Sequence, residues 1–312
     1  MSRIVSPLLT REAAAAMQAA LARGDATWRG SLDSGRSVDD VDLAAEGFRW
    51  RDIRWPWPAE ATRFKDRTFY AALSSADGGV DGGVDWQPVQ RFGASLIKLI
   101  PTAWGPPTFE IDGIKMLPTA QVSPWDDAAT KVGFVQPRGR RILDCCGGLG
   151  YYAAHALAHG AAHVQSFEKN PDVVWLRRLN PWSPDVDDAA NAGRFTLTEG
   201  DVSKAIAALP DAHFDAALHD PPRFGIAGEL YSQAFYDQLA RVLKPGAPLF
   251  HYTGTPNAKT SGRDVPGEVI TRLEKAGFRA ERKPDGVFAT KGRGPASGRA
   301  SGATRPGPRG AP

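Results

Sequence analysis

The pattern of hydrophobic and polar residues changes near the middle of the chain. From residue 141 onward, short apolar runs alternate with longer segments in which apolar residues recur at helical spacing. The runs expected to form strands are 141–145, 162–167, 195–198, 214–218, 248–252, 279–282 and 286–290. The segments expected to form helices are 151–159, 171–179, 202–209, 229–243 and 266–276. This alternation predicts an α/β fold with a mostly parallel sheet covered by helices.

The first part of the chain has a different pattern. An alanine-rich segment predicts a helix over residues 1–25, with Ser6-Pro7 at its start. From Trp28 to about residue 110, segments such as 38–43, 48–53 and 68–73 are broken by Gly, Pro and Asp, which is typical of short strands. Residues 96–116 predict a hairpin with a tight turn at 111–114.

These two patterns predict the domain organisation. We expect an N-terminal helix and a smaller β-rich domain over residues 1–110. An α/β domain over 111–291 follows, and 292–312 form a basic tail that is too poor in apolar residues to order itself. The alternative for the tail is a weak contact with nucleic acid or another partner.

Composition limits the class of protein. The hydrophobic share of 42% is enough for a core, and the absence of an apolar run near 18 residues predicts no membrane span. The N-terminus lacks a signal pattern. The two cysteines, Cys145 and Cys146, are adjacent, which argues against disulfides and zinc, so we expect no metal and a cytoplasmic location. Packing is the favoured role of these cysteines, and a nucleophilic cysteine is the alternative.

The net charge of +3 comes from the tail. Residues 291–312 hold five of the 38 basic residues and no acid, which leaves 33 basic against 35 acidic residues in the rest of the chain. The body is therefore slightly acidic and lacks the basic footprint of a nucleic-acid-binding protein.

Two features of the N-terminal part have more than one interpretation. Seven of the nine tryptophans precede residue 130, where they form either the core of the small domain or an aromatic acceptor-binding surface. The tandem repeat at 77–85 predicts a loop tip. A calcium site at Asp77, Asp81 and Asp85 is the weaker alternative, because the repeat lacks the alternating ligands of known calcium loops.

The most informative stretch is Asp144-Cys-Cys-Gly-Gly-Leu-Gly150. A predicted strand leads into a glycine turn and then a helix, which is typical of a site for a nucleotide-like ligand. Four predicted strands end in or next to an acid, namely Asp144, Glu168, Asp201 and Asp220. Because ligands of parallel α/β sheets bind outside the carboxyl ends of the strands, we expect these acids to share one site.

The spacing of these acids indicates the kind of ligand. Glu168 lies 24 residues after Asp144, where a carboxylate can accept hydrogen bonds from ribose hydroxyls. Asp201 can accept one from an adenine amine. The turn matches neither G-x-G-x-x-G nor G-x-x-x-x-G-K-[ST], so neither a dinucleotide nor a triphosphate is indicated. We expect an adenosine that carries a short polar arm.

Four segments resemble the motifs of class I S-adenosylmethionine-dependent methyltransferases: 144–150, Phe-Glu-Lys-Asn at 167–170, Glu-Gly-Asp-Val at 199–202 and Asp-Pro-Pro at 220–222. The runs at 115–125, 180–183, 219–224, 229–231 and 250–254 look more closely like an archaeal-type predicted methyltransferase family, itself similar to spermidine synthases. The resemblance covers 115–291. It implies a Rossmann-like, seven-stranded sheet with an antiparallel last strand, and S-adenosylmethionine as the donor.

The strand ends and the resemblance together give the expected site. The expected cofactor-binding residues are Asp144, Cys145, Gly147, Gly148, Gly150, Glu168, Lys169, Asp201, Val202 and His219. Asp220 is the catalytic candidate, because a carboxylate can hold an amine or take its proton. The expected substrate-binding residues are Pro221, Pro222, Arg223, Phe224, Tyr231 and Tyr252, together with Lys115, Thr119 and Ser123.

Two of these assignments leave alternatives open. The segment with Lys115, Thr119 and Ser123 either folds over the ligand or only links the domains. The methyltransferases that resemble this chain at Asp-Pro-Pro have an aromatic residue next, whereas this chain has Arg223 and then Phe224, which leaves stacking of an acceptor base undecided.

We therefore expect methyl transfer from S-adenosylmethionine to a nitrogen on a small molecule or RNA. One alternative is aminopropyl transfer from decarboxylated S-adenosylmethionine to a polyamine, which the small acidic excess of the body does not favour. The others are a non-catalytic binding module and an unrelated Rossmann-type enzyme. The sequence leaves the oligomeric state open, a dimer included.

Overall fold

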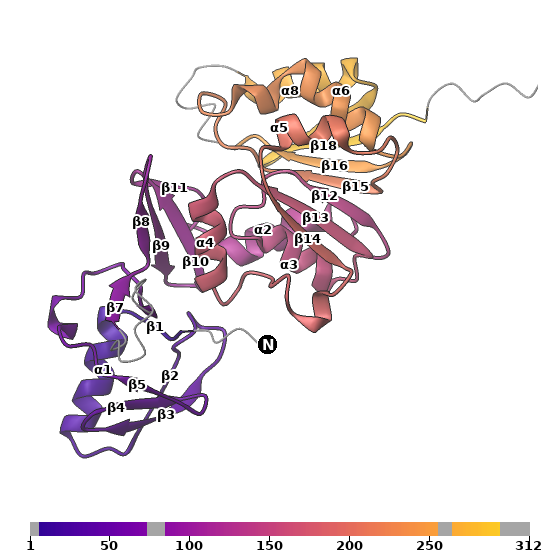
Figure 1. The fold of residues 1–312 in the computed structure, drawn as a ribbon. Coiled ribbons are helices and arrows are strands. Elements are labelled where there is room, and N and C mark those ends of the chain that lie inside the picture. The colour runs from indigo at the N-terminus through magenta and orange to yellow at the C-terminus, as the bar shows by residue number, and fades with distance from the viewer. Residues whose placement is uncertain (1–5, 74–84, 255–263, 294–312) are drawn as a thin grey trace, which may run out of the picture.

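The structure, a computed structural model, describes residues 6–73, 85–254 and 264–293. The N-terminal elements, a small hairpin sheet and the α/β part follow one another along an elongated molecule (Figure 1). The repeat at 77–85, except Asp85, and most of the tail lie outside the described residues.

The N-terminal part contains two small antiparallel sheets, with strand orders β2-β3-β4-β5 and β1-β6-β7. Its elements are β1 (Leu8–Leu9), α1 (Arg11–Ala22), β2 (Thr27–Gly30), β3 (Asp39–Ala44), β4 (Gly47–Trp50), β5 (Ile53–Pro56), the 3₁₀ helix η1 (Ala61–Arg63), β6 (Tyr70–Leu73) and β7 (Asp85–Pro88). Trp50, Trp55 and Trp86 are at most 9% exposed and share one hydrophobic cluster, so these tryptophans form a core.

Two predictions for this part were wrong in detail. Helix α1 begins at Arg11 and is capped by Thr10, whose side chain accepts a hydrogen bond from the amide of Ala13, because Ser6-Pro7 leads into strand β1 instead. The expected strand over 48–53 is the tip of a hairpin, because the backbone turns at Arg51 and Asp52, which both have positive φ.

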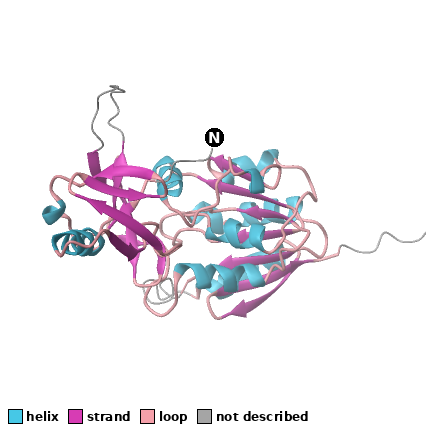
Figure 2. Cartoon of the chain, turned by 90° about the horizontal axis from the view of Figure 1, so that it is seen from below, coloured by secondary structure: helices cyan, strands magenta, loops and turns pink. Residues whose placement is uncertain are grey.

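The hairpin sheet has the order β11-β10-β9-β8 and stands between the N-terminal part and the α/β part (Figures 1 and 2). Its strands are β8 (Gln90–Phe92), β9 (Leu96–Thr102), β10 (Gly105–Ile111) and β11 (Ile114–Lys115). Asp112 and Gly113, with φ of 48° and 79°, form the turn that the sequence predicts. This sheet continues across residue 110, the predicted domain boundary.

The α/β part is built on a seven-stranded sheet of order β14-β13-β12-β15-β16-β18-β17. Its strands are β12 (Arg141–Asp144), β13 (His163–Glu168), β14 (Phe195–Glu199), β15 (Ala216–His219), β16 (Pro248–Tyr252), β17 (Phe278–Lys283) and β18 (Gly286–Lys291). Strands β12 to β16 are parallel, and β18 is antiparallel to β16. The expected fold, with an antiparallel last strand, is confirmed.

Helices cover both faces of this sheet (Figure 2). They are α2 (Pro124–Gly133), α3 (Tyr151–Ala158), α4 (Pro171–Leu179), α5 (Val202–Ala205), α6 (Gln233–Val242) and α8 (Val265–Lys275), with 3₁₀ turns η2 (Ala189–Asn191), η3 (Ile206–Ala208) and η4 (Gly228–Tyr231). The single helix expected over 229–243 is broken, because Ser232 is extended and caps α6.

Successive side chains along a strand point to opposite faces of the sheet, and each face packs against its own layer of helices. Ile142 packs in one cluster with residues of α2, α3 and α4, whereas Leu143 packs in the other with residues of α5, α6 and α8. Both side chains are fully buried, as is usual for parallel strands with two covered faces. The carboxyl ends of β12, β13 and β15 consequently meet at one edge of a rigid core.

Candidate functional site

The glycine turn lies between β12 and α3 and is fixed by what packs beneath it. A Cβ at Gly150, whose φ is +84°, would lie 2.5 Å from Nη2 of Arg177. A Cβ at Gly147 would collide with Oγ of Ser166 and lie 2.7 Å from Nη1 of Arg177. Close packing therefore requires both glycines, and the positive φ of Gly150 favours glycine there as well.

Asp144 lies beneath the turn and does not line the cavity described below. It is fully buried, and Ser166 donates a 2.8 Å hydrogen bond to its Oδ2. Burial raises the pKa of Asp144 to about 6, although the hydrogen bond from Ser166 and the charge of Arg177 act in the opposite direction. The structure thus gives Asp144 a supporting position under the turn.

A cavity of about 660 Å³ opens above the turn, a size typical of small-molecule sites. The strand ends and the turn contribute Cys145 to Leu149, Phe167 to Lys169, Gly200 to Val202 and Asp220. The hairpin sheet and the helices contribute further residues, among them Ile97, Phe109, Met116, Leu117, Asp127, Tyr152, Asp172, Ile226 and Glu229. Of the predicted site residues, Cys145, Gly147, Gly148, Glu168, Lys169, Asp201, Val202, Asp220 and Pro222 line this cavity.

Glu168 and Asp201 form one wall of the cavity. The carboxylate of Glu168 accepts hydrogen bonds from the amides of Gly148 at 2.9 Å and Asn170 at 2.8 Å. Burial raises the pKa of Glu168, and these amide bonds oppose that effect. The amide of Lys169 also acts on this carboxylate, so at least one of its roughly four lone-pair sites stays open for a further donor.

Asp201 also caps helix α5, because its Oδ1 accepts hydrogen bonds from the amide and the hydroxyl of Ser203. Its other oxygen lies 3.0 Å from Nζ of Lys169. Burial would raise the pKa of Asp201, but the bonds from Ser203 and Lys169 outweigh burial and lower it. Asp201 is therefore ionised at the edge of the cavity.

Asp220 lines the cavity together with residues that the sequence did not single out. The phenol of Tyr152 donates a 3.0 Å hydrogen bond to Oδ2 of Asp220. Asp127 also lines the cavity and lies 2.6 Å from Nζ of the buried Lys131. Burial raises the pKa of Asp220, while the charge of Lys131 and the bond from Tyr152 oppose the rise. A carboxylate of this kind is a stronger base than an exposed one.

Two buried histidines lie behind Asp220. Nε2 of His219 is 3.0 Å from the carbonyl of Leu230, and Nε2 of His251 is 2.9 Å from the phenol of Tyr236. The two imidazole rings are 4.4 Å apart. Burial lowers the pKa of His219 to about 4, so it is neutral at pH 7. His219 therefore packs behind the strand end and does not line the cavity.

Most of the expected substrate-binding residues lie outside the cavity lining. Those outside it are Pro221, Arg223, Phe224, Tyr231, Tyr252, Lys115, Thr119 and Ser123. Lys115 is exposed and donates to Thr119 at 3.2 Å, and Ser123 caps α2 by accepting from the amide of Asp126. Their hydrogen bonds stabilise the segment locally, which explains the difference from the expectation.

Both cysteines line the cavity, Cys145 being 2% exposed. Burial raises the pKa of both thiols well above the usual value. The thiolate, which is the nucleophilic form, is therefore disfavoured. This supports the packing interpretation over the nucleophile interpretation.

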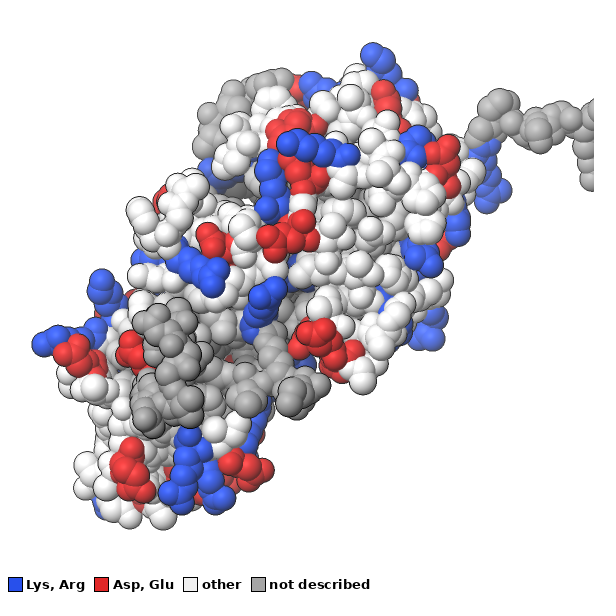
Figure 3. Space-filling view, in the orientation of Figure 1, with Lys and Arg blue, Asp and Glu red and all other residues white. Residues whose placement is uncertain are grey.

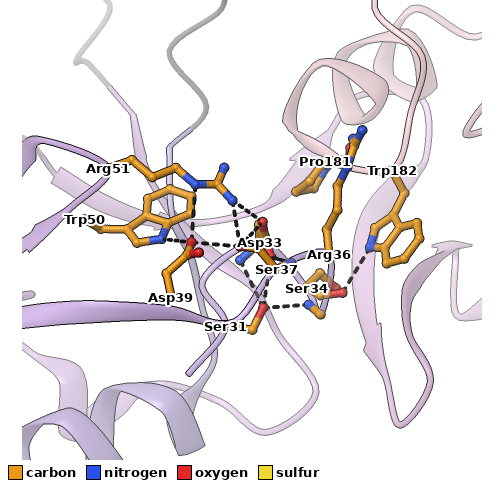
Figure 4. A network of polar contacts seen from close by, with 11 residues as sticks. Ser31, Asp33, Ser34, Arg36, Ser37, Asp39, Trp50, Arg51, Pro181 and Trp182 are labelled. Carbon is orange, nitrogen blue, oxygen red and sulfur yellow. Dashed lines mark hydrogen bonds and ion pairs between the residues drawn. The ribbon is translucent and has the colours of Figure 1, made fainter. Parts of the chain in front are cut away.

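A hydrogen-bonded segment, Asn180-Pro-Trp-Ser183, connects the N-terminal part to the glycine turn. Figure 4 shows the N-terminal side, where the indole of Trp182 donates to the carbonyl of Ser34 at 3.0 Å and Arg36 donates to the carbonyl of Pro181. On the other side, Ser183 donates to the carbonyl of Leu149 at 2.7 Å. The segment Asn180–Ser183 is therefore hydrogen-bonded to the N-terminal part on one side and to the glycine turn on the other.

The loop that makes these contacts is itself held by a buried carboxylate. Asp33 is fully buried and accepts hydrogen bonds from Ser31, Ser37 and Arg51 (Figure 4). Nothing in the sequence marked this loop, because its residues are ordinary turn formers whose partners lie far away in the chain.

Charged side chains of both signs occur together on one face of the molecule (Figure 3). Within residues 6–73, 85–254 and 264–293, no helix is long and apolar enough to cross a membrane. In the same ranges, no group of three or more His, Cys, Asp or Glu side chains is placed to hold a metal ion.

No protein-family model matches the chain. The structure is similar to two spermidine synthase structures, one in complex with the transition-state analogue AdoDATO and one from Thermotoga maritima, with TM-scores of 0.52 and 0.51. Both are 17% identical to this chain; each match covers 72% of it, and 76% and 75% of the respective neighbours. An S-adenosylmethionine-dependent methyltransferase from Mesorhizobium loti aligns with a TM-score of 0.38, too low to support a statement about this chain.

Two curated proteins are similar in sequence. A polyamine aminopropyltransferase of Streptomyces coelicolor is 32% identical over 123 residues, which are 38% of this chain but 22% of that protein. An uncharacterized protein of Methanocaldococcus jannaschii, MJ1233, is 43% identical over 200 residues, which are 63% of this chain and 67% of that protein. The chain therefore has a Rossmann-like α/β fold similar to that of spermidine synthases, and it belongs to the same family as MJ1233.

Proposed function

We propose that the cavity binds an S-adenosyl sulfonium compound and that the protein transfers the methyl group of S-adenosylmethionine to a nitrogen. The observation that carries this proposal is the placement of three strand-end acids, Glu168, Asp201 and Asp220, around one cavity above the glycine turn. The fold shared with spermidine synthases, which have been crystallised with an adenosyl transition-state analogue, supports the donor class.

The adenosine half of the donor fits the wall formed by Glu168 and Asp201. The open lone pair of Glu168 suits a ribose hydroxyl, and the hydrogen bond from the amide of Gly148 fixes the carboxylate against the turn. Asp201 can accept a bond from the adenine amine, while the buried side chain of Val202 offers an apolar contact to the base.

A positively charged donor suits the lining of the cavity. Six carboxylates line it, those of Asp127, Glu168, Asp172, Asp201, Asp220 and Glu229, against the one ammonium of Lys169. Several of these acids are paired, but the balance remains negative and favours a sulfonium over a phosphate-bearing ligand. This agrees with the missing phosphate-binding motifs.

Asp220 is the group placed to act on the acceptor. The sulfonium donor supplies an already activated alkyl group, so the protein mainly has to align a nitrogen lone pair with it. Asp220 would accept a hydrogen bond from that nitrogen and take its proton as the new N–C bond forms and the C–S bond breaks. Because burial raises its pKa, Asp220 is a stronger base than an exposed carboxylate.

Aminopropyl transfer from decarboxylated S-adenosylmethionine is the second candidate. The acidic lining suits a donor that lacks a carboxylate. The similar segment of the Streptomyces aminopropyltransferase and the fold of the spermidine synthases favour it as well. The run of motifs over 115–291 favours methyl transfer.

A donor panel distinguishes the two candidates. Thermal unfolding is followed with S-adenosylmethionine, S-adenosylhomocysteine, decarboxylated S-adenosylmethionine and methylthioadenosine. Methyl transfer predicts stabilisation by the first two compounds, in line with binding to the native state only. If only decarboxylated S-adenosylmethionine and methylthioadenosine stabilise the protein, the reaction is aminopropyl transfer and not methyl transfer. If none of the four compounds stabilises it, the proposed donor site is contradicted.

A further inference from the structure

The wall of the cavity that contains Asp127 and Asp220 includes a buried ion pair that the proposed transfer does not use. Nζ of Lys131 lies 2.6 Å from Oδ2 of Asp127 one helical turn earlier, with side-chain exposures of 3% and 12%. The same Nζ lies 3.9 Å from the centre of the Tyr252 ring. The hydrogen bond and the ring fix the ammonium in place.

This ion pair leaves Asp220 as the uncompensated carboxylate of the wall. Among the described residues, Asp220 has a hydrogen bond from Tyr152 but no ion pair. The charge of Lys131 also acts on Asp220 and lowers its pKa, whereas the charge of Asp127 raises the pKa of Asp220. Two carboxylates and one ammonium thus present a net charge of about −1 to an acceptor.

Two of the other described charges that act on this wall are exposed, whereas Asp144, which also interacts with Asp220, is buried below the glycine turn and does not line the cavity. Asp285 acts on Asp127 and Arg223 acts on Tyr252, but both side chains lie at the surface, where solvent screens them. The cavity lining also includes the apolar side chains of Met116, Leu117 and Ile226. One end of an acceptor would therefore meet a single negative charge, and the rest of it would meet apolar side chains.

We propose that the acceptor is an amine with a single basic nitrogen on an apolar body, and that Lys131 determines this specificity. By pairing with Asp127, Lys131 removes the second carboxylate that the far nitrogen of a diamine would need. Asp220 alone then holds the reacting nitrogen. This inference rests on the proposed function, because it assigns the nitrogen at Asp220 to the acceptor.

Two amines that differ only in a second nitrogen test this inference. S-adenosylhomocysteine is first titrated into each protein by calorimetry, which tests the donor site by itself. Hexylamine and 1,6-diaminohexane are then titrated into the saturated complexes. The wild-type protein is expected to bind hexylamine at least as tightly as the diamine. Lys131→Met, which frees the charge of Asp127, is expected to shift the ratio of the two affinities about tenfold toward the diamine.

Charge variants separate this role from a merely structural one. Asp127→Asn leaves Lys131 to neutralise Asp220 and is expected to weaken both amines. The double variant Asp127→Asn/Lys131→Met has one carboxylate again, contains no unpaired buried lysine, and is expected to restore the wild-type ratio. Lys204→Met, on an exposed position of α5, controls for the loss of a positive charge and is expected to keep the wild-type ratio.

The outcomes are distinguishable. Failure of S-adenosylhomocysteine to bind the wild-type protein contradicts the proposed function and the inference with it. Normal binding of S-adenosylhomocysteine with no amine binding, or with the same amine ratio in the wild-type protein and Lys131→Met, overturns the role of Lys131 alone. A double variant that keeps a diamine preference overturns it as well.

Discussion

The phenol of Tyr152 donates a 3.0 Å hydrogen bond to Oδ2 of Asp220, across 68 residues of sequence. Tyr152 lies in the first turn of α3, directly after the glycine turn, whereas Asp220 follows β15. The bond therefore joins the element that would hold the donor to the carboxylate that would act on the acceptor.

Replacement of Asp220 by asparagine tests the catalytic assignment. Asparagine keeps the shape but cannot take a proton, so we expect turnover to fall about 100-fold or more while donor affinity stays within about twofold. Turnover is measured with a panel of amines as release of the nucleoside product that the donor leaves after it loses its methyl or other alkyl group. Donor affinity is measured by calorimetry. Asp237→Asn, on an exposed position of α6, is the control, and equal turnover in both variants would remove Asp220 from the mechanism.

Replacement of Tyr152 by phenylalanine is expected to change the pH dependence of turnover. Burial raises the pKa of Asp220, and the bond from Tyr152 partly offsets this by stabilising the carboxylate. Without that bond the pKa rises further, so the acid limb of the pH–rate profile should move to higher pH, with little change on the plateau. An acid limb that stays in place or moves to lower pH would contradict the assignment of Asp220 as the base.

The packing beneath the glycine turn predicts different effects for two glycines. Gly150→Ala is expected to destabilise the protein by roughly 1–3 kcal/mol, since φ is +84° and the added methyl group meets Arg177. Gly133→Ala has nothing within 4 Å of the new Cβ and is expected to be neutral or to stabilise by about 0.5 kcal/mol. Denaturant unfolding measures both, and equal free energies of unfolding would argue against the described packing.

The buried histidine behind Asp220 makes stability depend on pH. The pKa of His219 falls from 6.5 to about 4 because burial disfavours the charged ring. The unfolded chain therefore binds a proton that the folded protein excludes, and stability should decline by about 3 kcal/mol as the pH falls from 6.5 to 4. His219→Gln should be less stable at pH 7 and show a shallower decline, and an unchanged slope would be inconsistent with this account.

The contact between the N-terminal part and the turn predicts an effect on donor binding. Trp182→Phe removes the hydrogen bond to Ser34 but keeps an aromatic ring, and we expect donor affinity to fall about three- to tenfold. Trp104→Phe removes a comparable indole bond, to the carbonyl of Thr119, away from the turn. Calorimetry should find normal donor affinity in this control; equal losses in both variants would exclude a specific role for the contact.

The α/β part was predictable because its signals are local. The central strands β12, β15 and β16 are short and contain apolar runs. Pro171, at the start of α4, and Gly277, after α8, mark helix ends by their own backbone preferences. The helix and strand boundaries that were predicted wrongly depend on hydrogen-bond partners that are distant in the sequence. Ser6 accepts a bond from the amide of Ala72, which draws it into β-structure and leaves the helix cap to Thr10.

The candidate site was only half predictable for the same reason. Glu168, Asp201 and Asp220 could be found because parallel strands bring their carboxyl ends together. Asp127, Lys131 and Tyr152 lie on helices, and which of their neighbours they face depends on how α2 and α3 pack on the sheet. The spacing of Asp127 and Lys131, one helical turn apart, was a signal, but it is shared by many exposed ion pairs.

Asp144 was predicted as a cofactor-binding residue, and the structure places it outside the cavity lining. Its place at the end of β12 made it a ligand candidate, yet Ser166 and Arg177 lie beside it below the turn. Sequence alone does not distinguish a carboxylate that faces a ligand from one that supports the loop holding the ligand.

The central claim is that the cavity above the glycine turn is an S-adenosyl donor site. Isothermal titration of S-adenosylmethionine into the wild-type protein and into Glu168→Ala tests it most directly, with Glu199→Ala, at the end of the neighbouring strand β14, as the control. The account predicts one site per chain in the wild-type protein and the control, and at least about tenfold weaker binding in Glu168→Ala. Absence of binding to the wild-type protein, or equal affinity in Glu168→Ala, would contradict it.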